Sequence, residues 1–464
     1  MTVQSRRMSD ISSLVQAQRV FFDSGATRPV AFRRAQLRRL RDALKSHEAE
    51  LAEALRVDLG KSATESFSTE IGQVGVELNH ALRHVAGWAR PRRVWPSLAQ
   101  LPGEGFIHPE PRGISLIIAP WNYPVQMILA PLVAALAAGN TALLKPSELA
   151  PASSAALATL VAGAFDPRVA VVIEGDGRVA QALLEQPIDF IFFTGGTGIG
   201  RKVAEAAAHQ LIPCVLELGG KSPVIVAADA DIELTAKRVA WGKFINAGQT
   251  CIAPDYALVE RSVMPAFVAA LKRHVSAFYG EDPRRSPDYG RIINARHLDR
   301  LSGYLSDGRV VHGGQFEPAE RYLAPTLIEE APLDSALMRE EIFGPILPIL
   351  PVDDIDEAIR FVNARPKPLA LYVFSRSRAQ QDKVLSQAQS GGACVNDTLF
   401  QISSPFMPFG GVGPSGYGGY HGRHGFDAFS HPRSVVRKGF GFDFWFRFAP
   451  MRASYLRILR WVLR

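Results

Sequence analysis

The chain has 464 residues, of which 47% are hydrophobic and 21% charged, so a soluble globular protein of two or three domains is expected. The formal net charge of +7 comes from dispersed basic residues without an aromatic-basic motif, which argues against a nucleic-acid partner. The 3 cysteines lie neither in a CxxC pair nor beside metal-spaced histidines, so we expect no disulfide framework, no metal centre and a reducing, cytoplasmic setting.

The N-terminal region is expected to be helical. Residues 1–18 contain no apolar run, so no signal peptide is expected, and no stretch reaches the roughly 20 apolar residues of a spanning helix. Residues 31–59 are rich in Arg, Leu, Ala and Glu and predict one long amphipathic helix that ends at Gly60. A second helix is expected over 65–88. The prolines and glycines of 91–113 predict a hairpin or an irregular connection.

Strands alternate with helices further along the chain. Short apolar strands are expected at 114–118, 141–145, 169–173, 190–193, 213–217, 223–226 and 257–259, and helices at 124–138, 151–164, 178–186, 199–209, 232–245 and 265–278. This alternation predicts an α/β fold with parallel sheets covered on both faces and right-handed crossovers. Ligands bind such sheets beyond the carboxyl ends of the strands, so polar residues there are candidates for a functional site.

A glycine-rich loop links one expected strand to the next helix. It reads FTGGTGIG over residues 193–200. Glycines let the backbone approach a phosphate, and the amino end of the helix favours the negative charge. The loop departs from the usual G-x-G-x-x-G pattern and follows the fourth strand of its unit, so a tight turn without a ligand is the alternative.

One cysteine is a candidate nucleophile. Cys251 lies in NAGQTCIAP, residues 246–254, a small polar turn after a helix. Exposed backbone amides in such a turn lower a thiol pKa and stabilise an oxyanion. The alternative is a buried structural cysteine, which is how we interpret Cys214 and Cys394.

Two polar residues at strand ends have two interpretations each. Glu217 lies between two leucines and is either paired with a cation such as Lys221 or a general base with a raised pKa. Asn122 lies in PWNYP and either donates to an oxyanion or caps the following helix.

Two further segments carry groups suited to a nucleotide. Lys145 and Glu148, three residues apart, either grip the hydroxyls of a ribose or form a surface ion pair. Glu341 and Phe343 either hold a second ribose and a ring or form a turn with a core Phe. For both segments taken alone, the structural interpretation is the stronger one.

Six segments in this order resemble the aldehyde dehydrogenase superfamily over nearly the whole chain before its last 25 residues: PWNYP (120–124), KPSE (145–148), FTGGTGIG (193–200), LELGGK (216–221), GQTC (248–251) and EIFGP (341–345). The short N-terminus, Tyr123, the GGTG loop, IAPDY after the cysteine and the C-terminal extension are most similar to class 3, which includes fatty aldehyde and coniferyl aldehyde dehydrogenases. The resemblance implies a Rossmann-like parallel-sheet cofactor domain, an α/β catalytic domain and a small oligomerisation element.

The resemblance also implies roles for single residues. Cys251 attacks the aldehyde carbonyl as a thiolate, and the Asn122 amide and the Cys251 backbone N–H hold the oxyanion. Hydride transfer to the nicotinamide leaves a thioester, and Glu217 activates the water that releases the acid. The implied cofactor residues are Lys145 and Glu148 at the adenosine ribose, Gly195, Gly196, Thr197, Gly198, Ile199 and Gly200 at the pyrophosphate, and Glu341, Phe343 and Trp121 towards the nicotinamide end.

The loop departs from the wider family at two positions. Gly196 stands where many members have Ser, so a hydroxyl contact to the pyrophosphate is missing, and Gly198 stands where many have Glu. Glu148 favours a free ribose 2′-hydroxyl and therefore NAD, with NADP as the alternative, since class 3 members also take NADP.

Domain limits and a homodimer follow from the same resemblance. The expected parts are 1–94 and 114–217 as the NAD(P)-binding domain, 218–398 as the catalytic domain, 95–113 and 399–435 as the oligomerisation element, and 436–464 as a C-terminal tail.

The tail from Phe440 is aromatic and basic. We expect a helix from Arg452 to Leu463, with Arg457, Arg460 and Arg464 on one face. It is too short and too charged to span a bilayer, but it is suited to peripheral contact with an anionic membrane. Packing on the partner subunit or over the substrate tunnel is the alternative, and we favour packing.

The implied substrate is an apolar aldehyde, medium- to long-chain or aromatic, with Trp241, Phe400 and the tail as candidate tunnel residues. Other interpretations are a thiol hydrolase, a dehydrogenase that passes its thioester to coenzyme A, and a non-catalytic protein on this fold. No histidine lies in a recognisable hydrolase motif, and Glu217 suits water as the acceptor. A non-catalytic protein has no need of both Cys251 and Glu217.

Overall fold

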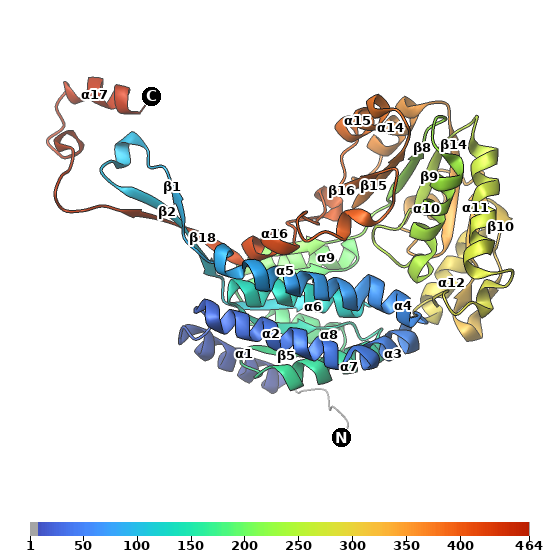
Figure 1. Cartoon of the computed structure of the whole chain (residues 1–464), viewed down its shortest axis with the longest axis horizontal. Helices are drawn as coiled ribbons and strands as arrows, with labels where there is room; N and C mark the ends of the chain where they lie inside the picture. Colours follow the sequence, from blue (N-terminus) through green and yellow to red (C-terminus); the bar gives the residue numbers. More distant parts are fainter. Residues whose placement is uncertain (1–7, 464) are drawn as a thin grey trace.

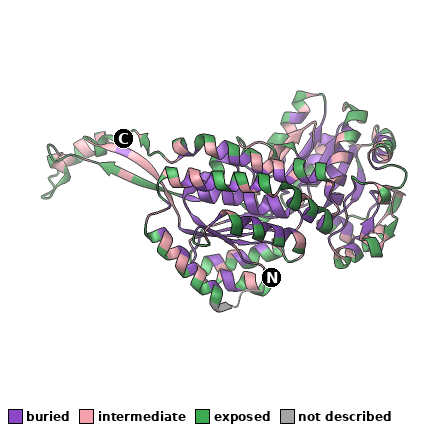
Figure 2. Ribbon diagram, turned by 60° about the horizontal axis from the view of Figure 1, so that its bottom comes forward, coloured by how far each residue is buried: buried purple, intermediate pink, exposed green. Residues whose placement is uncertain are grey.

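The computed structural model describes residues 8–463 and shows a two-lobed body from which an arm projects (Figure 1). Each lobe is built on one mostly parallel sheet, and the arm is a three-stranded sheet. Buried residues concentrate in the two sheets and the helices against them, whereas the arm is mostly exposed or half-exposed (Figure 2). The expected α/β class is confirmed. Of residues 1–18, where no signal peptide was expected, 1–7 lie outside the described part of the chain.

The sheet of the first lobe has the strand order β17-β7-β6-β3-β4-β5. Its strands are β3 (Ile114–Ile118), β4 (Thr141–Lys145), β5 (Ala170–Val172), β6 (Phe190–Thr194), β7 (Cys214–Glu217) and β17 (Gly416–Tyr417). The first five are parallel, and β17 pairs antiparallel with β7. The strand order reverses between β3 and β6, and such a switch point leaves a crevice at the carboxyl ends of the strands.

Helices cover both faces of this sheet (Figure 1). They are α1 (Met8–Asp23), α2 (Val30–Ser46), α3 (Glu48–Leu59), α4 (Ala63–Ser66), α5 (Gly72–Trp88), α6 (Pro124–Ala138), α7 (Pro151–Ala164), α8 (Gly177–Leu184) and α9 (Thr197–His209). All 15 residues of α6 are buried, because this helix lies between the sheet and the outer helices α2 and α5.

Two of the predicted helices are interrupted. The single helix expected over 31–59 is wrong: α2 and α3 are separate and meet at His47. There Nδ1 of His47 lies 2.9 Å from the carbonyl oxygen of Ala43, so the side chain competes with the backbone for a helix carbonyl. The helix expected over 65–88 contains a π-helical turn, Phe67–Ile71, between α4 and α5.

The sheet of the second lobe has the order β10-β13-β14-β9-β8-β15-β16. Its strands are β8 (Pro223–Val226), β9 (Tyr256–Glu260), β10 (Arg309–His312), β13 (Thr326–Glu329), β14 (Ile346–Val352), β15 (Ala370–Phe374) and β16 (Gly392–Val395). The helices of this lobe are α10 (Ile232–Phe244), α11 (Met264–Tyr279), α12 (Ala295–Gly303), α13 (Ala336–Arg339), α14 (Ile355–Asn363) and α15 (Arg378–Gln387), and a short hairpin joins β11 (Phe316–Glu317) to β12 (Tyr322–Leu323). The second α/β unit expected after Gly220 is therefore confirmed.

The arm consists of β1 (Arg92–Val94), β2 (Glu104–Pro111) and β18 (Ser430–Arg437), with α16 (Gly422–Ala428) at its base. The hairpin expected within 91–113 is the β1–β2 pair. The tail leaves β18 and ends near the tip of the arm in α17 (Tyr455–Val462), three residues later than the predicted start of this helix (Figure 1). Arg464 lies outside the described residues.

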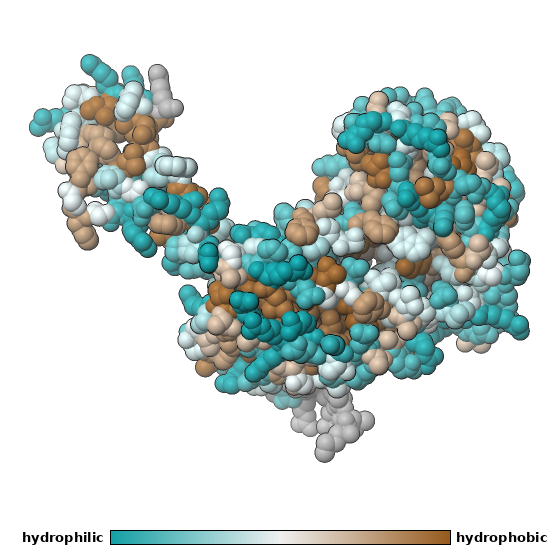
Figure 3. All heavy atoms as spheres, in the orientation of Figure 1, coloured by the Kyte–Doolittle hydropathy of each residue, from teal (hydrophilic) through white to brown (hydrophobic). Residues whose placement is uncertain are grey.

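Apolar side chains gather at the tip of the arm (Figure 3). Those exposed in the single chain are Trp95, Leu98, Leu101, Phe440, Phe442, Trp445, Phe448, Met451, Leu456, Trp461 and Leu463. Within residues 8–463, no helix combines the length and the apolar character that a membrane span needs.

Candidate active site

A cavity of about 260 Å³ lies at the carboxyl ends of β3, β6 and β7 and reaches the segment after α10 in the second lobe. Its lining residues are Pro120, Trp121, Asn122, Tyr123, Met127, Thr194, Gly195, Gly196, Glu217, Leu218, Gly219, Cys251, His297, Arg300, Glu341 and Phe343. Residues widely separated in the sequence, including all three predicted catalytic residues, therefore share one cavity. An adjoining groove shares Gly219 and Glu341 with it and includes Thr197.

The loop that carries Cys251 has a constrained backbone. Asn246 and Ala247 have φ of 52° and 51°, in the left-handed region that side chains disfavour. Gly248 has φ of 74°, and a Cβ there would lie 2.2 Å from the carbonyl oxygen of Gly344. The Gln249 side chain fixes the loop, because its Nε2 donates to Arg291 O at 2.9 Å and its Oε1 accepts from the backbone N–H of Ile293 at 3.0 Å.

The environment of Cys251 raises the pKa of its thiol to about 12. Burial is the largest cause, followed by the nearby carboxylates of Glu341 and Glu217. The backbone N–H groups of Cys251 and Ile252 act in the opposite direction but are outweighed. The backbone amides therefore act in the predicted direction, but burial and the two carboxylates make the net shift of this pKa upward.

Glu217 is a buried carboxyl group without a cation. The residue is 2% exposed, and neither carboxylate oxygen has a hydrogen-bond partner among the described residues. Lys221, the cation considered as its partner, instead pairs with Asp255 and donates to the carbonyls of Leu337 and Glu340 at 2.8 and 2.7 Å. Burial raises the pKa of Glu217 well above its usual value, so the group has the character of a proton acceptor.

Asn122 does not cap α6. The N-cap position belongs to Tyr123, which has no side-chain cap bond. Instead, Nδ2 of Asn122 donates to Gln249 O at 2.9 Å, next to the cysteine loop. The backbone oxygen of Asn122 accepts from the buried Lys61 ammonium at 3.0 Å and from Asn246 Nδ2 at 2.8 Å, which fixes this turn. One N–H of the Asn122 amide is left for another acceptor.

The glycine loop contains two kinds of glycine. A Cβ on Gly195 would lie 2.6 Å from the Phe193 ring, and one on Gly200 would lie 2.4 Å from Leu218, so packing requires these two glycines. A Cβ on Gly196 or Gly198 would meet no atom of the described residues within 4 Å, so open space lies over the amino end of α9. Open space at a helix amino end suits a phosphate group.

Of the remaining predicted cofactor residues, Trp121, Glu341 and Phe343 line the cavity together with Gly195 and Gly196, whereas Lys145 and Glu148 do not. Lys145 ends β4 and is 3% exposed; its Nζ lies 2.6 Å from Pro146 O and 3.4 Å from Glu148 Oε2. Oε1 of Glu341 is buried without a hydrogen-bond partner among the described residues. Phe343, at φ 48°, stacks edge-on against Trp121 with 5.3 Å between ring centroids. A free carboxylate oxygen for hydroxyl groups and an aromatic wall fit a nicotinamide nucleotide.

The comparisons with known proteins agree with this geometry. The model of the aldehyde dehydrogenase family matches residues 1–435. The chain belongs to this family. It is 43% identical to the 4,4'-diaponeurosporen-aldehyde dehydrogenase of Staphylococcus aureus over 93% of this chain and 94% of that protein. It is 44% identical to the dimeric NADP-preferring aldehyde dehydrogenase of Canis lupus familiaris over 92% and 95% of the two chains.

A solved structure gives the same result. Staphylococcus aureus AldH in its substrate-bound state superposes with a TM-score of 0.95 at 42% identity, covering 97% of this chain and 99% of that one. A family 3 member, A2 of Mus musculus, is 44% identical over 90% of this chain and 86% of that protein. The aldehyde dehydrogenase fold and the class 3 resemblance are therefore confirmed. The chain is an NAD(P)-dependent enzyme of aldehyde oxidation.

Two residues of the aldehyde dehydrogenase site were not predicted from the sequence. His297 lies 5.1 Å from the Trp121 ring, and Arg300 donates to Ile342 O at 2.8 Å. Burial and Arg300 lower the pKa of His297 to about 4, so the ring is neutral at pH 7. Both residues lie on α12, whose sequence carries no recognisable motif; a periodic helix following Asn294 was the only available signal.

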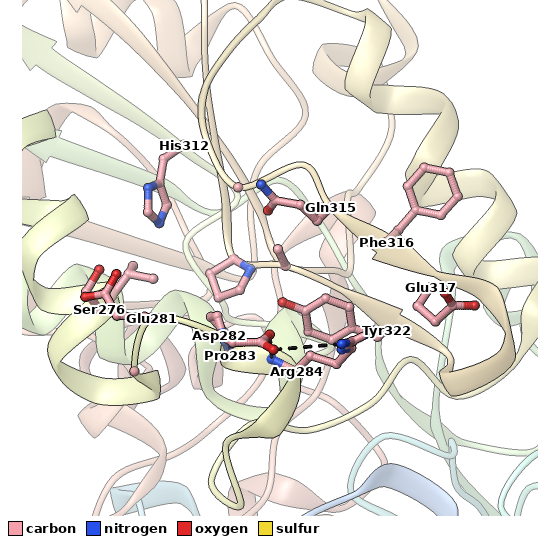
Figure 4. Close-up of a pocket in the computed structure, with 15 residues that line it drawn as sticks. Ser276, Glu281, Asp282, Pro283, Arg284, His312, Gln315, Phe316, Glu317 and Tyr322 are labelled. Carbon is pink, nitrogen blue, oxygen red and sulfur yellow. Dashed lines mark hydrogen bonds and ion pairs between the residues drawn. The ribbon is translucent and has the colours of Figure 1, made fainter.

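A second cavity lies apart from these residues, near the C-terminal end of α11 (Figure 4). Its wall mixes charges and aromatic rings, including Asp282, Arg284, His312, Glu317 and Tyr322. None of the residues predicted for catalysis or cofactor binding lines it.

Proposed function

We propose that Cys251, Glu217 and Asn122 carry out the oxidation of an aldehyde to a carboxylic acid. The observation that carries the proposal is the unpaired Glu217 carboxylate in the same cavity as the Cys251 thiol and the Asn122 amide. A buried carboxylate without a cation costs stability, and such groups occur where a reaction uses them.

In the first step Glu217 accepts the thiol proton, and the Cys251 thiolate adds to the aldehyde carbon. The carbonyl oxygen becomes an oxyanion that accepts hydrogen bonds from the Asn122 amide and the Cys251 backbone N–H. The bound nicotinamide supplies the hydride acceptor. Once hydride has left, the product on Cys251 is a thioester. Glu217 then releases the thiol proton to solvent and takes a proton from water, and the hydroxide adds to the thioester carbon. The acid leaves as the Cys251 sulfur takes this second proton back from Glu217.

For the cofactor we propose three contact regions. Lys145 and Glu148 hold the adenosine ribose, and the backbone of Gly195, Gly196, Thr197, Gly198, Ile199 and Gly200 lies along the pyrophosphate. Glu341, Phe343 and Trp121 position the nicotinamide end. Glu148 favours NAD, because a carboxylate repels the 2′-phosphate of NADP.

The proposed substrate is an apolar aldehyde, either medium- to long-chain or aromatic. The cavity wall includes Trp121, Met127 and Phe343. Trp241 and Phe400 stack with centroids 5.7 Å apart, and Phe400 is 57% exposed, so they supply an apolar surface beyond the cavity. The Staphylococcus aureus relative is named for an aldehyde of 4,4'-diaponeurosporene, which supports an apolar substrate here.

We further propose a division into a cofactor unit (1–94 and 114–217), a catalytic unit (218–398), an oligomerisation element (95–113 and 399–435) and a tail (436–464), with the arm joining two copies as a homodimer. The exposed apolar side chains at the arm tip support this, because patches of this kind are usually covered by a partner. Size-exclusion chromatography with light scattering, with and without residues 440–464, tests the dimer. Flotation with anionic vesicles tests the rival, peripheral membrane contact in the cytoplasm.

The decisive experiment measures nicotinamide reduction by absorbance with NAD or NADP and a panel from propanal to hexadecanal plus benzaldehyde. Wild type should reduce the cofactor, with kcat/KM rising with chain length, and Cys251→Ala should not. Identification of the acid, with and without coenzyme A, separates hydrolysis from acyl transfer. Silence from folded wild-type protein with every aldehyde and both cofactors would overturn the proposal.

A further inference from the structure

A buried ion pair outside the cavity contacts the turn that carries Asn122. Lys61, just after α3, and Glu70, in the π-helical turn Phe67–Ile71, are both 0% exposed, and Lys61 Nζ lies 2.6 Å from Glu70 Oε1. Neither is among the residues that line the cavity around Cys251. Turns of this kind are rare and often occur at functional sites. Apolar side chains of similar volume often stabilise a fold as well as a buried ion pair does, so stability alone does not account for this pair.

Glu70 caps the amino end of the buried helix α6. Its Oε2 accepts hydrogen bonds from the backbone N–H groups of Val125 at 2.9 Å and Gln126 at 3.2 Å. Both of these residues are buried, so their N–H groups are out of reach of water. The N-cap residue, Tyr123, makes no side-chain cap bond among the described residues, and Glu70 supplies the cap from 55 positions before Val125. The carboxylate lies at the positive end of the helix dipole, which favours its charge.

The Lys61 ammonium joins this cap to the turn before α6. Besides its contact with Glu70, Nζ donates to the backbone oxygen of Asn122 at 3.0 Å and lies 4.0 Å from the centre of the Tyr123 ring. Two hydrogen bonds and one cation–π contact match the three N–H groups of an ammonium. The ion pair therefore fixes the first backbone N–H groups of α6 together with the residues just before them.

The same turn contacts the loop of the proposed nucleophile. Asn122 Nδ2 donates to Gln249 O at 2.9 Å. The hydroxyl groups of Tyr123 and Thr250 lie 2.6 Å apart. Gln249 and Thr250 directly precede Cys251 in the sequence. Contacts therefore run from the ion pair through this turn to the cysteine loop, and a shift of the turn would move the Asn122 amide relative to the Cys251 thiol.

We propose that Lys61 and Glu70 are positioning residues for the oxyanion site: together they hold the backbone of Asn122 so that its side-chain amide is directed at the oxygen of the reacting carbonyl group. Neither residue touches substrate or cofactor. The proposal rests on the oxyanion role given above to Asn122. The effect of the pair should appear only in reactions that form an oxyanion, because a donor misplaced by about 1 Å lowers such a rate by about 10²-fold.

Two reactions of the Cys251 thiol, followed on the whole chain without cofactor at one pH, test the proposal. Acylation by p-nitrophenyl acetate forms an oxyanion: sulfur bonds to the carbonyl carbon, Glu217 accepts the thiol proton, and nitrophenolate leaves. Alkylation by iodoacetamide displaces iodide from a saturated carbon and forms no oxyanion. The ratio of the two rates, each after subtraction of the rate seen with Cys251→Ala, reports oxyanion stabilisation separately from the reactivity of the thiol.

The pair and Asn122 should affect this ratio in the same direction. Asn122→Ala should lower it by about 10²- to 10³-fold, and Lys61→Met by about ten- to a hundredfold. The double variant Lys61→Met/Glu70→Gln leaves no unpaired carboxylate in the interior and should show a loss of similar size. Asp58→Asn is the matched control, because Asp58 is buried and accepts from the first N–H groups of α7, at Ala152 and Ser153; it should leave the ratio unchanged.

Adding Lys61→Met to Asn122→Ala should change the ratio by less than about twofold, because the amide that the pair positions is gone. A wild-type ratio in the folded double variant, an equal loss with and without Asn122, or an equal loss in Asp58→Asn overturns the proposal. An unchanged ratio in Asn122→Ala overturns the oxyanion role of Asn122 itself, and this proposal with it. Where a variant of Lys61 does not fold, Glu70→Gln, which keeps the shape of the side chain, serves the same comparison.

Discussion

Two carboxylates at the same edge of the first sheet differ in their burial and in their pairing with a cation. Glu217, at the end of β7, is 2% exposed and unpaired among the described residues. Glu148, just after β4, has a 46% exposed side chain and lies 3.4 Å from the Lys145 ammonium. A buried unpaired carboxylate lowers stability, whereas a half-exposed ion pair changes it little. The difference supports the proposed catalytic role of Glu217 and the proposed cofactor contact of Glu148.

Glu217→Gln tests the role of the buried carboxyl group and has the largest expected effect. The neutral amide keeps the shape but removes the base, so kcat should fall by about 10²–10⁴-fold. The fold should become more stable at neutral pH, because a neutral amide avoids the free-energy cost of burying or protonating this carboxylate. Steady-state kinetics together with thermal unfolding test both. A variant that keeps wild-type kcat would make Glu217 a structural residue.

Asn122→Ala separates oxyanion binding from packing. Loss of one oxyanion donor costs about 10²–10³-fold in kcat. Asn140 is the matched control, since its side chain is also buried but bonds only Gly113 N, Ala135 O and Phe429 O among the described residues. Asn140→Ala should lower the unfolding temperature and leave kcat within about threefold. Equal kinetic loss in both variants would contradict the assignment of Asn122.

The raised pKa of the Cys251 thiol predicts its reactivity without ligands. The thiolate is the reactive form and is scarce below pH 12, so the rate of alkylation should rise about tenfold per pH unit from 7 to 9 without levelling off. Mass spectrometry of the modified peptide follows Cys251 separately from Cys214 and Cys394. A plateau near pH 7 would mean that the resting enzyme already holds a thiolate.

Glu148→Gln tests the half-exposed carboxylate and has the smallest expected effect. Removal of the half-exposed carboxylate relieves repulsion of a 2′-phosphate, so the ratio of kcat/KM for NADP to that for NAD should rise by about three- to tenfold. The unfolding temperature should change little, because the Glu148 side chain is 46% exposed and the buried Lys145 ammonium keeps the carbonyl oxygen of Pro146 as a hydrogen-bond acceptor. An unchanged ratio would remove Glu148 from cofactor selection.

The local sequence predicts the helices and strands of this fold better than it predicts side-chain contacts between distant residues. The strands at 114–118 and 141–145 are short, mostly apolar segments, and their length and their alternation with helical segments predict them. The interruption at His47 was not predicted, because the sequence on both sides keeps a helical pattern and the interruption involves one side-chain contact. Likewise, Lys221 was considered a partner for Glu217 from sequence proximity, whereas its partner Asp255 lies 34 positions away in the chain.

The candidate site likewise contains residues that the sequence predicted and residues that only the structure reveals. The resemblance named Cys251, Glu217 and Asn122, and all three line one cavity. His297 and Arg300 lie in no recognisable motif, and the fold alone brings them beside Trp121 and the other residues of the cavity. The direction of the Cys251 pKa was also beyond local sequence, since it depends on burial and on two carboxylates from distant segments.

The pairing of β17 with β7 joins the strand that carries Glu217 to a segment near the C-terminal end of the chain. Gly416 lies opposite Glu217, and Ser415 O accepts a hydrogen bond from the backbone N–H of Leu218 at 3.1 Å, so residues about two hundred positions later in the chain cover the outer edge of the strand that ends in Glu217. Without this C-terminal segment the outer edge of β7 has no neighbour in the sheet. The strand that ends in Glu217 is therefore fully paired only when nearly the whole chain is present.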